Sequence, residues 1–408
     1  MGQREQGTQH GSKAERTVGI IGCGSMGERH ARAFIATGRL EPCLRVTHLC
    51  DRDSARAHRV ADLFTQAGLP RPSVTVRAED LFADGGLDSV DVVLPTSAHH
   101  GVCVQALRAG KHVLVEKPLA LDVEQAASMV GAAAANDRVL SVAENYRRVG
   151  ANRALRALLD RSDGVVSMTT DIVCSPLHDA RHNAADWYAD PDTAGSYLAH
   201  EMGAHEMDLV RFLLGEVESV HCVPRFSAHE PSRDPRRATG LFATLTCASG
   251  AVAQMSLRSS DHEPPGGSRR IVLEDGGHVL SQAWEVWDGW HQGRGGARTT
   301  TDEALTALAA HTGEVGNGRG SSDPALRHEP VRPLFARDDV ARSGVASAVH
   351  EFAHAVAGVR EPEIDGVDGM RTLALCESLI LSARSSRTSW SGSRSATVAG
   401  MSTRLDRS

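Results

Sequence analysis

The sequence predicts an α/β protein of two domains, the first built on a doubly wound parallel sheet. Two observations predict this fold class. Short apolar runs alternate with helical segments up to residue 144, as they do when helices connect parallel strands. After residue 144 the pattern changes to strand-like runs separated by Gly or Pro turns. The 408 residues suffice for two domains of roughly 100–200 residues each.

The first element is the apolar run Thr17–Ile21, which leads into a glycine turn and a predicted helix. In Gly22-x-Gly24-x-x-Gly27 the first glycine permits a tight turn, the second admits a pyrophosphate and the third lets helix and strand pack closely. Phosphates are favoured at the helix N-terminus by free N–H groups and the helix dipole. The residues predicted to contact a dinucleotide here are Gly22, Gly24, Ser25, Met26 and Gly27.

A second apolar run, Leu44–Cys50, ends in Asp51, which lies 24 residues after Gly27. An acidic residue at about this distance is expected to bind the ribose hydroxyls of the adenosine half. Asp51 favours NAD because a carboxylate repels a 2′-phosphate, while the adjacent Arg52 keeps NADP possible. The alternative is that Asp51 is only a turn residue at the end of the strand.

The next elements continue the alternation and place further polar segments at strand ends. The expected helices are Ala55–Phe64, Ala78–Phe82, His100–Ala109 and Val123–Ala135, and the expected strands are Ser73–Val76, Val90–Leu94, His112–Val115 and Val139–Val142. Ligands bind such sheets at the carboxyl ends of the strands. Pro95–His99 and Glu116–Pro118 fall at those ends. The additional cofactor-binding candidates are therefore Pro95, Thr96, His99, Glu116 and Lys117.

The second domain is expected to be α+β, with an open and mostly antiparallel sheet that offers a free face for a dimer contact. Its expected strands are Val165–Cys174, Val217–Val223, Leu241–Cys247, Val252–Leu257 and Arg270–Leu273, and its expected helices are Asn152–Leu159, Tyr197–Leu214, Ala346–Ala357 and Gly369–Ser385. The polar segment His291–Ser343 is predicted to be an elaborated loop with one helix at Glu303–Ala310. The domains then span residues 16–144 and 145–390, between disordered tails at 1–15 and 391–408.

Composition excludes several classes of protein. The 44 basic and 51 acidic side chains give a net charge of −7, which argues against nucleic acid as the partner. Eight scattered cysteines without a C-x-x-C pair are typical of a reducing compartment. The polar first fifteen residues lack the apolar stretch of a signal peptide, and no run is long enough to span a membrane. We therefore expect a soluble, cytoplasmic protein.

Lys117 is the first residue predicted to carry chemistry. Pro118 disfavours helical backbone at Lys117, so the lysine is expected to be extended at a strand end, over the crevice. A partly desolvated lysine beside a cationic nicotinamide ring is expected to have a lowered pKa. The alternative is a solvated surface lysine.

A second group lies on the helix predicted at Tyr197–Leu214. In helical periodicity Glu201, His205 and Asp208 share one face, which suits binding vicinal hydroxyls and accepting a proton. The alternative is a buried histidine whose hydrogen-bond partner is Asp208. No metal is predicted, because His200 and His205 are five residues apart, whereas a zinc helix uses i and i+4.

Other candidates lie near the domain boundary. Tyr146 and Arg147–Arg148 follow the predicted boundary, and the two arginines are expected either to bind a substrate anion or to form interdomain salt bridges. Trp187–Tyr188 is either the wall of a sugar site or a packing anchor. His30, after the glycine turn, is expected to pack or cap locally.

Several segments, in order along residues 16–390, resemble the glucose–fructose oxidoreductase/inositol dehydrogenase (Gfo/Idh/MocA) family. They are Val18–Gly27, Pro95-x-x-x-His99, Ala109–Pro118, Gly195…Gly203-x-His205-x-x-Asp208 and Phe352…Asp368–Gly369…Ser382–Ala383. The resemblance implies a Rossmann domain, NAD or NADP, and a second domain that oligomerises through its sheet as a homodimer or homotetramer. It also implies oxidation or reduction of a secondary hydroxyl on a sugar, cyclitol or sugar derivative.

The same resemblance implies roles for individual residues. Lys117 is then the lysine next to the reacting hydroxyl and His205 the acid/base on the substrate side. Glu201 stands where the family usually has Asp, and Leu94 stands where a Thr is common. Ala194–Ser196 replaces the family's glycine run. The predicted catalytic residues are Lys117, His205 and Glu201, and the predicted substrate-binding residues are Tyr146, Arg147, Trp187, Glu201, His205 and Asp208.

The sequence thus predicts an NAD(P)-dependent dehydrogenase in which Lys117 or His205 takes the hydroxyl proton. Two other functions stay open. In one, bound NAD is a recycled cofactor and transient oxidation enables epimerisation or elimination. In the other, the protein is a non-catalytic regulator that responds to a dinucleotide.

Overall fold

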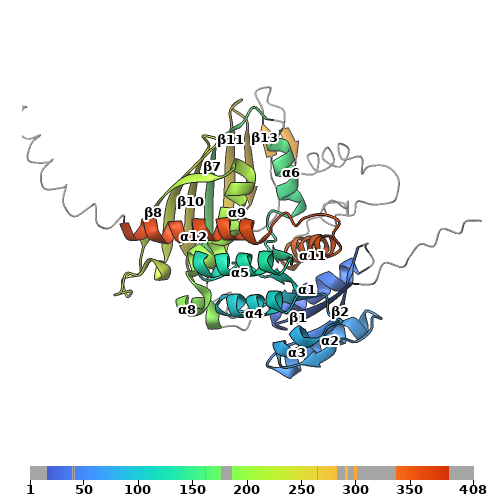
Figure 1. Cartoon of the computed structure of the whole chain (residues 1–408). Coiled ribbons are helices and arrows are strands. Elements are labelled where there is room, and N and C mark those ends of the chain that lie inside the picture. Colours follow the sequence, from blue (N-terminus) through green and yellow to red (C-terminus); the bar gives the residue numbers. More distant parts are fainter. Residues whose placement is uncertain are drawn as a thin grey trace, which may run out of the picture.

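The computed structural model describes residues 16–38, 40, 42–160, 162–175, 186–263, 265–282, 290–292, 298–300 and 337–385. The expected tails at 1–15 and 391–408 and the expected helix Glu303–Ala310 lie outside these residues. Figure 1 shows two sheets with helices between them, the first sheet in the part of the chain coloured blue to green.

The first sheet is parallel and has six strands in the order β3-β2-β1-β4-β5-β6. This is the strand order of doubly wound dinucleotide-binding domains, so the predicted fold class is confirmed. The strands are β1 (Arg16–Ile21), β2 (Leu44–Cys50), β3 (Ser73–Thr75), β4 (Ser89–Val92), β5 (His112–Val115) and β6 (Leu140–Val142).

The helices between these strands lie close to their predicted positions. They are α1 (Ser25–Thr37), α2 (Ser54–Gln66), α3 (Ala78–Ala83), α4 (Thr96–Arg108) and α5 (Val123–Ala135). Aspartates cap two of them, because Asp53 accepts from the amide of Ala55 and Asp122 from that of Gln125. Helix α4 begins four residues before its predicted start, with Pro95 in extended backbone as its N-cap.

Each face of this sheet has its own hydrophobic core. On one face Val18 and Ile20 pack with side chains of α1, α2 and α11 (Arg337–Val356). On the other face Ile21 belongs to a core that includes residues of α4 and α5 and continues into the second domain. Helix α11, assigned by the sequence to the second domain, packs against α1 (Figure 1).

The second sheet has eight strands in the order β14-β13-β12-β11-β7-β10-β9-β8. Only β10 and β7 pair in parallel, so the predicted open and mostly antiparallel sheet is confirmed. The strands are β7 (Val165–Cys174), β8 (Val217–Arg225), β9 (Gly240–Cys247), β10 (Val252–Ser259), β11 (Gly266–Leu273), β12 (His278–Gln282), β13 (Trp290–Gln292) and β14 (Arg298–Thr300). The last three were not predicted, and β13 and β14 lie where a loop was expected.

Helix α12 (Gly366–Ser385) packs against β8 and β9 of the second sheet. The second domain also has α6 (Gly150–Leu159), α8 (Pro191–Ala194) and α9 (Gly203–Leu214), with short turns η1 (Asp186–Ala189), η2 (Tyr197–Met202) and η3 (Pro235–Arg237). Helix α12 contacts β8 and α9 on one side and α5 on the other (Figure 1). It therefore joins the two domains.

Candidate active site

The glycine turn has the geometry that a dinucleotide requires. Gly22 has φ +104°, and a Cβ on it would lie 2.0 Å from the carbonyl oxygen of Val93. A Cβ on Gly27 would lie 2.0 Å from the carbonyl oxygen of Gly22. A Cβ on Gly24, in contrast, would meet no atom within 4 Å, so this glycine faces open space. That open cradle fits a pyrophosphate approaching the backbone.

The N-terminus of α1 adds to this fit. Gly24 is its N-cap, and no side chain caps the first turn, so the helix presents backbone N–H groups to the open cradle. Asp51 lies beside the turn, where its carboxylate accepts from the amides of Cys23 (2.8 Å) and Asp53 (2.9 Å). Arg52 is exposed.

The side chains of Thr96 and His99, in the segment after β4, form hydrogen bonds to other groups of the protein. His99 is fully buried, and its ring nitrogens lie 2.8 Å from the carbonyl of Leu94 and 3.0 Å from that of Pro118. Thr96 is also buried and donates to Oε1 of Glu201 (3.2 Å). The His99 side chain thus braces the loop that follows β5, and the contact of this segment with a cofactor stays a prediction.

Lys117 joins the two domains at the carboxyl end of β5. Its Nζ donates to Oε2 of Glu201 (3.0 Å) and to the Glu201 backbone carbonyl (3.1 Å). Burial alone lowers the pKa of Lys117, but the carboxylates of Glu201 and Glu116 outweigh burial and raise that pKa above its usual value. This direction is opposite to the one expected for a lysine beside a nicotinamide ring. The alternative of a solvated surface lysine fails, because the side chain is only 17% exposed.

Glu201 owes its position to a π-helical turn. The segment predicted as one helix is a π-turn over Tyr197–Met202, followed by α9. Ser196 caps the π-turn through the amide of Ala199, and Gly195 enters it with φ +74°. The wider turn presents both the carboxylate and the carbonyl of Glu201 to Lys117, an arrangement typical of functional sites.

His205, on the first turn of α9, is held from two sides. Its Nδ1 lies 2.8 Å and 2.9 Å from the two carboxylate oxygens of Glu144, the second residue after β6. The ring of Tyr146 stacks on the imidazole, with centroids 3.9 Å apart and planes 9° apart. The alternative in which Asp208 is the partner of His205 is therefore wrong. Glu144 was not singled out from the sequence, although it follows the carboxyl end of a strand, which is the signal that marks Asp51 and Lys117.

Arg147 and Asp208 are paired with each other. The guanidinium of Arg147 binds Asp208 in a bidentate manner, with Nε at 2.7 Å, and also binds Asp368 at 3.0 Å. Arg148 is fully buried and pairs with Glu351. The two arginines therefore form salt bridges, but their partners lie in the second domain and not across the domain boundary. A role of Arg147 and Asp208 in binding substrate stays a prediction.

Trp187 and Tyr188 lie in the turn η1 and stack on each other, with centroids 4.1 Å apart. Tyr188 lies near enough to Lys117 to contribute to the raised pKa of that lysine.

A buried histidine between two acidic residues lies beneath the site. His30 is fully buried, with Nδ1 2.7 Å from Asp91 and Nε2 2.9 Å from Glu116. Glu116 also accepts from the amide of Lys117 (3.0 Å), so this cluster supports the segment that carries the lysine. His30 packs inside the domain as expected, but its two acidic partners were not foreseen.

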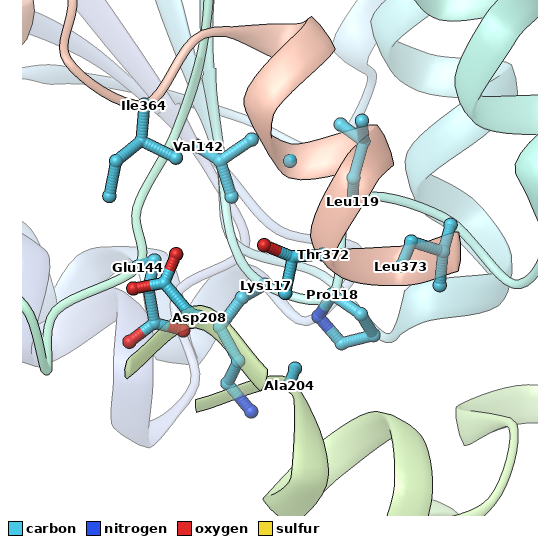
Figure 2. Close-up of a pocket in the computed structure, with 11 residues that line it drawn as sticks. Lys117, Pro118, Leu119, Val142, Glu144, Ala204, Asp208, Ile364, Thr372 and Leu373 are labelled. Carbon is cyan, nitrogen blue, oxygen red and sulfur yellow. The ribbon is translucent and has the colours of Figure 1, made fainter. Parts of the chain in front are cut away.

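A cavity lies behind Lys117, on the side of α12. Figure 2 shows the lysine stem beside Pro118, with Glu144 and Asp208 together on one side and Thr372 on the other. The remaining lining residues are Leu119, Val142, Ala204, Ile364, Gly369 and Leu373. The carboxylates of Glu144 and Asp208 thus form part of the wall of this cavity.

Within the described ranges no group of three or more His, Cys, Asp or Glu side chains has the arrangement of a metal site. All eight cysteines are free. No helix among the described residues is long and apolar enough to cross a membrane.

Comparison with known proteins identifies the family. The model described as "Oxidoreductase family, NAD-binding Rossmann fold" matches residues 16–144, and the "GFO/IDH/MocA C-terminal domain" matches residues 153–278. The chain belongs to the Gfo/Idh/MocA family of NAD-binding oxidoreductases. The resemblance found in the sequence is thereby confirmed.

Individual relatives in the Gfo/Idh/MocA family act on sugars by name. A D-apiose dehydrogenase of Paraburkholderia graminis is 25% identical over 377 residues, which cover 90% of this chain and 88% of the relative. A dTDP-3,4-didehydro-2,6-dideoxy-alpha-D-glucose 3-reductase of Actinomadura kijaniata is 31% identical over 248 residues, 59% of this chain and 67% of the relative. The chain spans only 58% and 53% of two others, an uncharacterized protein of Saccharomyces cerevisiae and a levoglucosan dehydrogenase of Pseudarthrobacter phenanthrenivorans.

Among solved structures, levoglucosan dehydrogenase in complex with NADH and levoglucosan has the same fold. Its TM-score is 0.73 at 20% identity, over 91% of this chain and 97% of that one.

Proposed function

We propose that this protein transfers hydride between a nicotinamide cofactor and a secondary hydroxyl, or the matching ketone, of a sugar, cyclitol or sugar derivative. The observation that carries the proposal is the contact of Lys117 with Glu201, which joins the two domains at the sheet edge that also bears the glycine turn. The sugar class is supported by the names of the relatives, among them the D-apiose dehydrogenase.

The cofactor would be held by residues of the first domain. Gly22, Gly24 and Gly27 and the N-terminus of α1 would hold the pyrophosphate, and Asp51 would bind the adenosine ribose and favour NAD over NADP. The bound nicotinamide supplies the hydride chemistry. Residues 16–144 thus form the dinucleotide-binding domain, and residues 145–390 form the domain for substrate binding and self-association.

Lys117 and His205 have separate roles in this proposal. Glu201 and Glu116 keep Lys117 protonated, so its ammonium donates a hydrogen bond to the substrate oxygen and stabilises negative charge that develops there. His205 takes the hydroxyl proton during oxidation and returns it during reduction. Glu201 holds the lysine, while Tyr146 and Trp187 line the substrate side.

We also propose that the protein forms a homodimer or homotetramer through the outer face of the second sheet. On the described part of that face Val223 is 48% exposed and Phe242 is 39% exposed, and they are directly paired across β8 and β9. Helices α9 and α12 cover only the opposite face. An exposed apolar pair on a sheet face that no described helix covers suits association with a second copy.

The proposal is tested with the purified full chain, NAD and NADP, and a panel of cyclitols, aldoses, amino sugars and sugar nucleotides, by absorbance of the reduced nicotinamide. We expect net reduction of NAD with at least one of these substrates. Lys117→Met should lower kcat by about 10²–10³-fold, because it removes a charge that stabilises the transition state.

Lys111→Met is the matched control, because Lys111 is buried in the same domain but donates to the backbone carbonyl of Leu87 (2.8 Å). It should reduce stability without the loss of kcat. Tightly retained NAD with no net reduction of either cofactor would favour a recycled cofactor or a regulator instead. Equal turnover by Lys117→Met and wild type would show that Lys117 has no role in the reaction.

A further inference from the structure

We propose that Glu144 is a positioning residue that fixes the tautomer of His205, so that Nε2 exchanges the substrate proton. The kinetic consequence rests on the proposed function, whereas the tautomer is a property of the protein alone. The two parts are therefore tested separately.

The geometry fixes the imidazole from two directions. Nδ1 of His205 lies within 2.9 Å of both carboxylate oxygens of Glu144, and that carboxylate accepts a further bond from the amide of Tyr146 (2.8 Å). Glu144 is only 3% exposed, so water does not compete for its oxygens. The Tyr146 ring, stacked on the imidazole, prevents it from tilting.

The chemistry of these groups decides which nitrogen carries the proton. Burial raises the pKa of Glu144, but His205, the Tyr146 amide and Lys117 outweigh burial and lower that pKa below its usual value. An ionised carboxylate only accepts hydrogen bonds, so Nδ1 must be the donor. In the neutral ring Nε2 then has a lone pair. Among the described residues no hydrogen bond to Nε2 is found, and the side chain keeps 10% of its surface exposed.

In this arrangement Nε2 of His205 acts as the base, while the carboxylate of Glu144 binds Nδ1. The histidine of a Ser-His-Asp triad is held by its aspartate in the same way. When the substrate is oxidised, its O–H bond breaks and an N–H bond forms at Nε2, while the carbinol carbon gives up hydride to the nicotinamide of the proposed function. Glu144 stabilises the resulting imidazolium without taking the proton. In reduction the same proton returns to the substrate oxygen.

The tautomer is tested by nitrogen NMR on the full chain labelled with ¹⁵N in its histidines. The chain has 20 histidines, and the signals lost in His205→Asn identify the one of interest. At a pH where the ring is neutral, we expect a protonated Nδ1 and a bare Nε2. In Glu144→Gln this preference should weaken, because an amide both donates and accepts. A proton on Nε2 in the wild type would overturn the inference even if the enzyme turns over.

The kinetic test uses Glu144→Gln, which keeps the shape of the side chain and removes its charge. We expect kcat to fall at least about 100-fold with KM changed only a few-fold, and a larger solvent isotope effect, because proton transfer becomes slower. In a His205→Asn background, Glu144→Gln should cause no further loss, since its effect is exerted through His205.

Glu206→Gln is the matched control. Glu206 follows His205 directly on α9 and is also buried, but its carboxylate pairs with Arg269 at 2.6 Å and not with the imidazole. It should lower thermal stability and leave kcat and the isotope effect unchanged. The inference fails if Glu144→Gln behaves like Glu206→Gln, or if its effect adds fully to that of His205→Asn. Absence of turnover in the wild type would instead refute the proposed function, and the NMR result would still decide the tautomer.

Discussion

At the scale of single residues, His30 stands out because it is fully buried between the carboxyl groups of Asp91 and Glu116. Burial alone lowers the pKa of His30, but Asp91 and Glu116 outweigh burial and raise it to about 10. In return, His30 outweighs the burial of Glu116 and lowers the pKa of that carboxyl. The charge stabilises the end of β5, where Lys117 follows Glu116 directly.

His30→Gln should therefore destabilise the protein at pH 7 by about 3–5 kcal/mol, because two buried carboxylates lose their cation. The folded pKa of about 10 lies above the reference value of 6.5, so this proton-linked stability is complete below pH 6.5 and is lost as the pH rises through 10. The difference between wild type and variant should thus narrow from pH 7 to pH 10, measured by chemical denaturation.

His112→Gln provides the control for this titration. The pKa of His112 is lowered to about 4, chiefly by burial and by Arg138, so His112 is neutral over the whole range. Its effect on stability should not change between pH 7 and pH 10. A constant deficit in His30→Gln would show that His30 carries no charge in the folded protein.

At the scale of elements, the π-turn η2 decides where Glu201 lies. A Cβ on Gly195 would stand 2.9 Å from the His200 ring, and its φ of +74° is one that other residues rarely adopt. The Nδ1 of His200 in turn accepts from the amide of Ser196 (3.0 Å). Gly195 and His200 thus stabilise the start of the π-turn. Burial is the main cause that lowers the pKa of His200 to about 4, so its ring is neutral.

Gly195→Ala should disturb both stability and catalysis. We expect a loss of about 1–3 kcal/mol from backbone strain, and a kcat/KM about 10-fold lower because the turn that carries Glu201 must shift against Lys117. Gly215→Ala is the control, since Gly215 also has a positive φ (+94°) but a Cβ there would meet nothing within 4 Å. It should cost stability only. An unchanged kcat/KM in Gly195→Ala would show that the conformation of the π-turn does not affect catalysis.

An element was predictable when residues within it or next to it in the sequence determine its structure. The strand and helix boundaries of the first domain follow from apolar period and turn residues, so β5 and α5 were predicted without error. The π-turn was not, because its apolar residues fit an ordinary helix and the extra residue is set by packing around Gly195. Strands β13 and β14 are three residues each and rest on pairing at a sheet edge, which leaves little pattern in the sequence.

The site residues differ in the same way, by how local the cause of their position is. Lys117 and Glu201 lie in motifs that the sequence displays, and the structure brings them together. Glu144 and His205 are 61 residues apart, as are His30 and Asp91, and these pairs exist only once the domain has folded. The sequence therefore did not reveal which acidic residue pairs with each buried histidine.

At the scale of the whole molecule, the outer face of the second sheet is where a second copy would bind. Phe242→Lys should shift the protein from the proposed oligomer to a monomer in analytical ultracentrifugation, because a charge would replace an apolar contact. Leu381→Lys is the control, since Leu381 is 59% exposed but lies on α12. A wild-type protein that is monomeric at micromolar concentration would contradict the proposal.

The packing of α11 against α1 has a consequence for the newly made chain. Phe352 is fully buried in the same core as Val18 and Ile20, although more than 300 residues separate them in the sequence. A ribosome therefore releases every strand of the first sheet long before it releases the helix that covers one side of it. We expect the nascent first domain to keep that side open until α11 has been synthesised, and to need protection from aggregation during that interval.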